Sequence, residues 1–144
     1  FQNSKKMQTE VLTKRLKSRA INPTAMRLLI LDKLMNTDVA LSLADLEIEM
    51  DKADRVTIYR TLKTFEESKL IHSIEDGSGS IKYALCESNC KCTPEFTHAH
   101  FHCTNCNQTF CLRNIHLPEI HLPKNFIAEQ SSFILKGICD QCKS

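Results

Sequence analysis

The sequence predicts an α+β fold, with an N-terminal winged helix-turn-helix domain and a small C-terminal α/β dimerisation domain that holds a four-cysteine zinc site. Four stretches with helical periodicity precede a hairpin signal, which is the element order of a winged helix. All eight cysteines lie between Cys86 and Cys142, and four of them form two Cys-x-x-Cys pairs. We therefore expect a winged-helix domain at 1–86, a hinge loop at 87–97 and a zinc-stapled dimerisation domain at 98–144.

Two helices are expected first. Residues 9–19 repeat apolar side chains at helical spacing, with lysine and arginine on the other side. A second helix follows within AINPTAMRLLILDKLMN, where Asn22 or Thr24 can serve as the N-cap. The residues that these helices should direct toward a core are Val11, Leu12, Leu16, Met26, Leu29, Ile30 and Leu34.

Two further helices and a hairpin complete the first half. SLADLEIEM, from Ser42, predicts a short capped helix with Leu43, Leu46 and Met50 facing inward, and RVTIYRTLKTFEESKLI predicts a fourth helix. The β-prone runs IHSIE and IKYALC are separated by DGSGS, which is typical of a hairpin.

The fourth helix has the side chains that a DNA-reading helix needs. Ile58, Leu62 and Phe65 form an apolar stripe, and the opposite face is polar and basic. Arginine can pair with guanine edges, and lysine can neutralise phosphate. An ordinary solvated face, which any amphipathic helix has, is the alternative. Residues 1–72 carry 13 basic and 10 acidic residues, which is only a weak basic excess. The expected DNA-binding residues are Arg55, Thr57, Tyr59, Arg60 and Lys63, with Lys14, Arg15 and Arg27 as further phosphate contacts.

The second half should contain three strands, in HAHFHC, QTFCLRN and NFIAEQSSFILKGIC. A unit of roughly 50–60 residues is too small to be stable unaided. Metal ligation and dimerisation would both stabilise it.

The two Cys-x-x-Cys pairs indicate a structural zinc site. Cys103–Cys106 and Cys139–Cys142 are separated by 32 residues. Each pair forms a tight turn that directs both sulfurs to one point, and two such turns give the tetrahedral set of four thiolates that zinc favours. Disulfides remain an alternative, whereas a redox motif would be expected to have a single pair.

A second metal site is indicated by the remaining histidines. His98 and His100 are two residues apart on a predicted strand, so they share a face. Candidate partners are His72, Cys86 and Cys111. Such a mixed nitrogen and sulfur set suits Zn²⁺ better than Fe²⁺ or Mn²⁺. The alternative is that these are core or surface histidines and plain buried thiols.

Several of these motifs together resemble the ferric-uptake regulator (Fur) family of bacterial metal-dependent repressors. They are RVTIYRTLKTFEESKLI with its wing, HAHFHCTNC, GICDQC and INPTAMRLLIL, and the resemblance covers nearly the whole chain. It implies a homodimer that binds double-stranded palindromic operator DNA. It also implies a regulatory metal at the hinge, which holds the two DNA-binding domains at a spacing that fits successive major grooves.

The zinc-uptake regulator (Zur) subgroup resembles the chain more closely than the iron-type members do. Iron-type members carry histidine and glutamate where this chain has Ala40 and Ala84. A third metal site of the family is missing its usual ligands, since Thr97, Ala99 and Ser131 or Ser132 stand in their places. The regulatory ligands that the resemblance implies are His72, Cys86, His98 and His100, with Cys111 in place of the usual glutamate.

We therefore expect a zinc-responsive repressor with a structural Zn²⁺ and a regulatory Zn²⁺, or Fe²⁺ as the alternative. An iron- or peroxide-responsive regulator of the same family is the nearest rival. A zinc hydrolase using His98, His100 and Cys86, and a metal-buffering or redox protein built on CESNCKC, belong to other classes. No apolar run reaches membrane-spanning length and no secretory signal is evident, so we expect a cytoplasmic protein.

Overall fold

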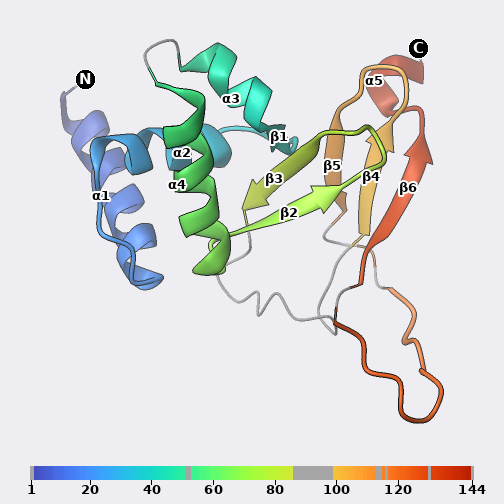
Figure 1. The fold of residues 1–144 in the computed structure, drawn as a ribbon. Helices are drawn as coiled ribbons and strands as arrows, with labels where there is room; N and C mark the ends of the chain where they lie inside the picture. Colours follow the sequence, from blue (N-terminus) through green and yellow to red (C-terminus); the bar gives the residue numbers. More distant parts are fainter. Residues whose placement is uncertain are drawn as a thin grey trace.

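The computed structural model describes residues 2–50, 53–85, 99–112, 115, 117–129 and 131–143, without the side chains of residues 2–4. Figure 1 shows helices α1 to α4 on one side and the strands β4 to β6 on the other, with the hairpin β2–β3 between them. The helices of the first half are α1 (Gln2–Ser18), α2 (Ala25–Met35), α3 (Leu43–Glu49) and α4 (Arg55–Glu67).

The helix starts follow from capping side chains. Thr24 accepts a hydrogen bond from the backbone of Arg27 at the start of α2. Ser42 and Asp45 form a reciprocal capping box at α3. Asp54 caps α4 by accepting from the backbone N–H of Thr57. The predicted helix at 9–19 begins earlier, at residue 2, because the preceding lysines, glutamines and methionine are good helix formers.

A hydrophobic core joins the four helices to the hairpin. The stripe Ile58, Leu62 and Phe65 on α4 is fully buried, which confirms the predicted inner face. The expectation was wrong for Val11 and Leu29, which are 54% and 52% exposed. On α2 the inward face is formed by Ile30, Leu31 and Leu34, so Leu29 is rotated toward solvent.

The wing sheet consists of β1 (Leu41–Ser42), β2 (Ile71–Glu75) and β3 (Ile81–Leu85), in the order β1-β3-β2. The predicted hairpin is confirmed, and β1 was not predicted because two residues carry no periodicity. Its turn uses Gly77 and Gly79 at positive φ, +85° and +90°. Side chains alternate, so Ile71 and Tyr83 pack into the helical core while the opposite face is left for another partner.

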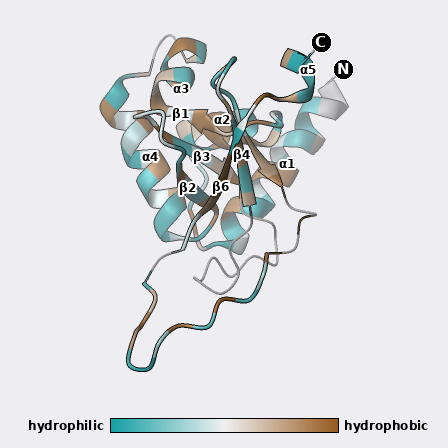
Figure 2. Ribbon diagram, turned by 90° about the vertical axis from the view of Figure 1, so that its right-hand side faces the viewer, coloured by the Kyte–Doolittle hydropathy of each residue, from teal (hydrophilic) through white to brown (hydrophobic). Residues whose placement is uncertain are grey.

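The C-terminal sheet consists of β4 (Ala99–Cys103), β5 (Thr109–Leu112) and β6 (Phe133–Gly137), followed by the short helix α5 (Asp140–Lys143). The order is β5-β4-β6, with β6 parallel to β4. Three strands were predicted, but the third is shorter than expected, since residues 125–129 lie in a loop. Figures 1 and 2 show this segment reaching away from both sheets. Within the described ranges, no helix is both long and apolar enough to span a membrane.

The free face of the wing sheet packs against the C-terminal sheet. Ala40, Ile74 and Ala84 are buried there, and Cys111 and Ile134 of the C-terminal sheet pack against them. The two histidines nearest this contact, one on each sheet, face each other. Both faces of the wing sheet are therefore covered.

A buried polar network extends the same contact. Asp76 follows β2 and is 1% exposed. Its Oδ2 lies 3.0 Å from the Lys82 ammonium, 3.2 Å from Nδ1 of His102 and 2.5 Å from the Thr109 hydroxyl that donates to it. Burial raises the pKa of Asp76, but hydrogen bonds from Ser78, Thr109 and Lys82 outweigh it and hold the pKa well below its ordinary value.

Replacing Asp76→Asn should destabilise the protein by roughly 3–5 kcal/mol near neutral pH, because it leaves the buried Lys82 ammonium without its anion. The unfolded chain binds a proton at Asp76 near the ordinary pKa of 3.8, whereas the folded chain does so only at lower pH. The stabilising contribution is therefore complete above about pH 5 and is lost as pH falls.

Chemical denaturation of the wild type and of Asp76→Asn, measured from pH 7 down to about pH 3, tests this. The difference in the free energy of unfolding should shrink toward acid pH. The exposed residue Asp140, changed to Asn, serves as the control. A difference that stays constant across this range would contradict the assignment of a low pKa to Asp76.

Candidate metal centres and DNA-binding surface

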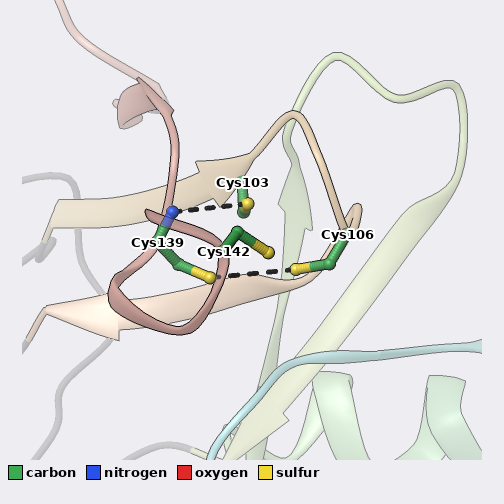
Figure 3. A group of neighbouring side chains, drawn as sticks. All are labelled: Cys103, Cys106, Cys139 and Cys142. Atoms are coloured by element: carbon green, nitrogen blue, oxygen red, sulfur yellow. Dashed lines mark hydrogen bonds between the residues drawn. The ribbon is translucent and has the colours of Figure 1, made fainter. Parts of the chain in front are cut away.

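Four cysteine sulfurs meet at the far end of the C-terminal sheet. Cys103 ends β4, Cys106 lies in the turn before β5, Cys139 follows β6 and Cys142 lies in α5. Their sulfur atoms all lie within 4.8 Å of one another. Figure 3 shows the four side chains converging. The sulfurs of Cys106 and Cys139 are 4.0 Å apart. The predicted structural zinc ligands are thus brought to one point, which we call the tetrathiolate site.

Backbone turns hold these cysteines. Asn107 adopts a positive φ of 61°, and its N–H donates to the Cys103 carbonyl at 2.9 Å, which closes the first turn. In the second turn the N–H of Cys142 donates to the Cys139 carbonyl at 3.2 Å. The N–H of Cys139 also donates to the Cys103 sulfur at 3.4 Å, so the two turns are joined.

The thiols compete for ionisation. Backbone N–H groups of Cys106 and Cys139 lower the pKa of Cys103 to about 6. A hydrogen bond from Asn105 lowers the pKa of Cys142, but the neighbouring thiols of Cys139, Cys106 and Cys103, together with burial, raise it to about 11. Four thiolates at one point require a cation, and a closed set of four sulfurs with backbone donors fits Zn²⁺ in a structural role. None of the five described cysteines is in a disulfide.

A second cluster lies between the two sheets. His72 from β2, His100 from β4 and Cys111 from β5 place their donor atoms within 4.8 Å of one another. The Nε2 atoms of His72 and His100 are 3.3 Å apart, and His100 is directly opposite Cys111 in the strand register. Cys86 and His98, also predicted as ligands, lie outside the described residues. Two imidazoles and a thiol form a borderline-soft set that fits Zn²⁺.

Cys111 is the ligand candidate that the sequence indicated least clearly. It lies two residues after the buried Thr109 on β5. Residues two apart on a strand share a face, so Cys111 lies on the same face as Thr109, beside His100. By contrast, His102 shares this face of β4 but turns to Asp76 and Thr109 instead.

The predicted DNA-reading residues form one exposed face of α4. Arg55, Thr57, Tyr59 and Arg60 are exposed, and Lys63 is half-buried. Arg55 lies 3.7 Å from Glu47. Lys63 lies 3.4 Å from Glu66, which raises the pKa of Lys63, and 5.6 Å from the ring centroid of Tyr59. These exposed ion pairs are weak and leave the face available for phosphate.

The additional phosphate contacts predicted outside α4 differ in exposure. Lys14 on α1 is exposed, whereas Arg15 and Arg27 are half-buried. Arg27 also donates from Nη1 to the Asn22 carbonyl at 2.9 Å. Lys14 is therefore the one of these three whose side chain is most open to a partner.

The chain matches a known protein family over most of its length. Residues 18–139 match the model of the ferric uptake regulator family. The chain belongs to this family. The ferric uptake regulation protein of Campylobacter jejuni is 28% identical over 148 residues, covering 94% of this chain and 88% of that protein.

Solved structures of ferric uptake regulators and zinc uptake regulators share the fold. A zinc uptake regulator complexed with zinc and DNA matches with a TM-score of 0.64 and 22% identity, covering 94% of this chain and 95% of that one. The ferric uptake regulator of Vibrio cholerae matches with a TM-score of 0.59 and 18% identity, covering 88% and 98%. The predicted fold class is confirmed.

Members of the ferric uptake regulator family are metal-responsive transcription regulators and not enzymes. The chain is therefore a regulator, and the zinc-hydrolase and metal-buffering alternatives are wrong. Membership of this family does not determine whether the regulatory metal is zinc or iron, because both kinds of regulator share the fold.

Replacing Cys103→Ser should remove roughly one zinc ion per chain, because three thiolates do not close a tetrahedral site. Without this ion, the C-terminal sheet should no longer unfold in a cooperative thermal transition. Elemental analysis after gel filtration, with circular dichroism, measures both. Cys111→Ser is the matched control and should keep this zinc and the fold. A Cys103→Ser protein with unchanged zinc content and thermal transition would contradict the structural role.

Proposed function

We propose that the chain is a zinc-responsive repressor that binds palindromic operator DNA as a homodimer. The observation that supports this most directly is the cluster His72, His100 and Cys111. Its first member comes from the wing sheet and the other two from the C-terminal sheet, so an ion held there fixes one sheet against the other. Cys86 and His98 would complete the ligand set.

The proposed response depends on the spacing of two α4 helices in a dimer. Half-sites one helical turn apart require recognition helices about 34 Å apart. Residues from both sheets can hold the ion only when the wing lies on the C-terminal sheet, so metal binding favours this closed arrangement. A ligand shifts such an equilibrium only by its differential affinity for the two states.

Zinc is favoured over iron by the available donors. Two imidazole nitrogens and one sulfur are softer than the oxygen-rich sets that Fe²⁺ and Mn²⁺ prefer. Ala40 and Ala84, which line the same contact, supply no donor atom.

The proposed homodimer is supported by apolar surface around the C-terminal sheet. Figure 2 shows apolar stretches interspersed along the loop that leads to β6. An exposed apolar surface of this kind on a small unit is typical of an interface. The exposed residues are Ile115, Ile120, Leu122, Phe126, Ile127, Phe133, Leu135 and Ile138. A regulator of this kind would act in the cytoplasm, where its operator DNA lies.

Operator affinity at buffered free-metal concentrations tests the proposed metal response. Zn²⁺ should tighten binding of a palindromic A·T-rich duplex by at least roughly tenfold, within the usual range of coupling between sites. His100→Ala should abolish this effect in a dimer that remains folded, because it removes the central ligand. His121→Ala, at an exposed position, is the control. Tightening by Fe²⁺ but not by Zn²⁺, measured by fluorescence anisotropy, would exclude the zinc assignment.

Arg60→Ala should weaken zinc-dependent operator binding by about 1–3 kcal/mol if this exposed guanidinium pairs with a base edge. The loss should be larger for the operator than for a scrambled duplex, since a base contact carries sequence information. The exposed Lys124 lies in the C-terminal segment, and Lys124→Ala is the control. Equal affinities of Arg60→Ala and wild type would place the reading surface elsewhere.

A further inference from the structure

Two rows of side chains cross the contact between the wing sheet and the C-terminal sheet. Because side chains alternate along strands, β4 and β5 each supply one residue to each row. His100 and His102 are two residues apart on β4, as are Cys111 and Thr109 on β5. The first row is the metal cluster described above. The second row is the buried polar network, and its members are Asp76, Lys82, His102 and Thr109.

The second row is a closed hydrogen-bonding system. The Lys82 ammonium has three N–H groups and three acceptors: Asp76 Oδ2 at 3.0 Å, the Thr109 hydroxyl oxygen at 3.1 Å and the Asn107 carbonyl. The Thr109 hydroxyl, which accepts from Lys82, donates to Asp76. The other Asp76 oxygen accepts from the Ser78 N–H at 2.9 Å. We call Asp76, Lys82, His102 and Thr109 the latch.

The latch joins the two sheets rather than stabilising either one alone. Asp76 and Lys82 belong to the wing, and His102 and Thr109 belong to the C-terminal sheet. All four side chains are buried. A desolvated ion pair contributes little net stability, but its geometry selects one arrangement, since any other leaves buried charges unpaired.

The wing turn also lies next to a side chain from β6, at the far edge of the C-terminal sheet. A Cβ atom added at Gly77 would lie 2.5 Å from Nζ of Lys136, which is paired with His102 in the strand register. The end of this exposed side chain therefore reaches the wing turn from β6. A slip of one residue would turn the latch and metal residues of a strand to its opposite face.

We propose that Asp76, Lys82 and Thr109 are positioning residues for the metal site between the sheets. The latch holds the wing on the C-terminal sheet so that the Nε2 atoms of His72 and His100 are already 3.3 Å apart. This inference rests on the proposed function, because it assigns that cluster to a regulatory ion. The latch sets the fraction of protein that is ready to bind, and the apparent affinity falls in proportion when that fraction falls.

The test uses the full chain with its tetrathiolate site loaded with zinc, titrated with Co²⁺ in competition with a chelator. Thr109→Val removes the hydroxyl that links Lys82 to Asp76, while Thr109→Ser retains it. Thr109→Val should weaken Co²⁺ binding at the metal site between the sheets by roughly 5–150-fold. Thr109→Ser should bind as wild type does.

A second variant removes both charges together, so that no buried charge is left unpaired. Asp76→Asn combined with Lys82→Met should show the same loss of Co²⁺ affinity. Lys33→Met is the control, because it breaks an exposed ion pair with Glu49 at 3.5 Å. Operator binding by the latch variants should return to the wild-type level at saturating Zn²⁺, which a merely misfolded protein would not show.

Unchanged Co²⁺ affinity in both folded latch variants would overturn the proposal, as would operator binding that saturating Zn²⁺ does not restore. Failure of the proposed function looks different. In that case the wild type itself would show no metal-dependent operator binding, or His100→Ala would retain it.

Discussion

The structure depends on the contact that β4 makes with the wing. This strand is the middle strand of its sheet, and alternation along it directs His100 and His102 to the face that the wing covers. Ile74 and Ala84 supply the apolar part of the contact from the wing. Because the wing sheet is buried on both faces, the helical core and the metal cluster are separated by only the thickness of one sheet.

The tetrathiolate site is connected to the same strand. Cys103 is the last residue of β4, and the turn that it begins carries Cys106 and Asn107. The carbonyl of Asn107 accepts a hydrogen bond from Lys82 of the wing. The turn that carries two of the four cysteines therefore also contacts the wing through its backbone. The tetrathiolate site, the latch and the site between the sheets are thus all connected to this one strand.

Much of this arrangement could be predicted from the sequence, because it depends on local signals. Capping residues such as Thr24 and Ser42, the stripe on α4 and the two Cys-x-x-Cys pairs act over a few residues. Cys111 and Asp76 could not be assigned in the same way. Their roles depend on which strands become neighbours, and single residues such as these carry no spacing pattern. Leu29 was misassigned because neighbouring leucines on α2 compete for the same face.

Amide hydrogen exchange tests the central claim that one metal site joins the two sheets. It would be measured on the zinc-stapled chain before and after Zn²⁺ fills the site formed by His72, His100 and Cys111. If the sheets are joined there, protection will rise together in β2 of the wing and in β4 and β5 of the C-terminal sheet. Protection that rises in β4 and β5 while β2 exchanges as before would contradict the account.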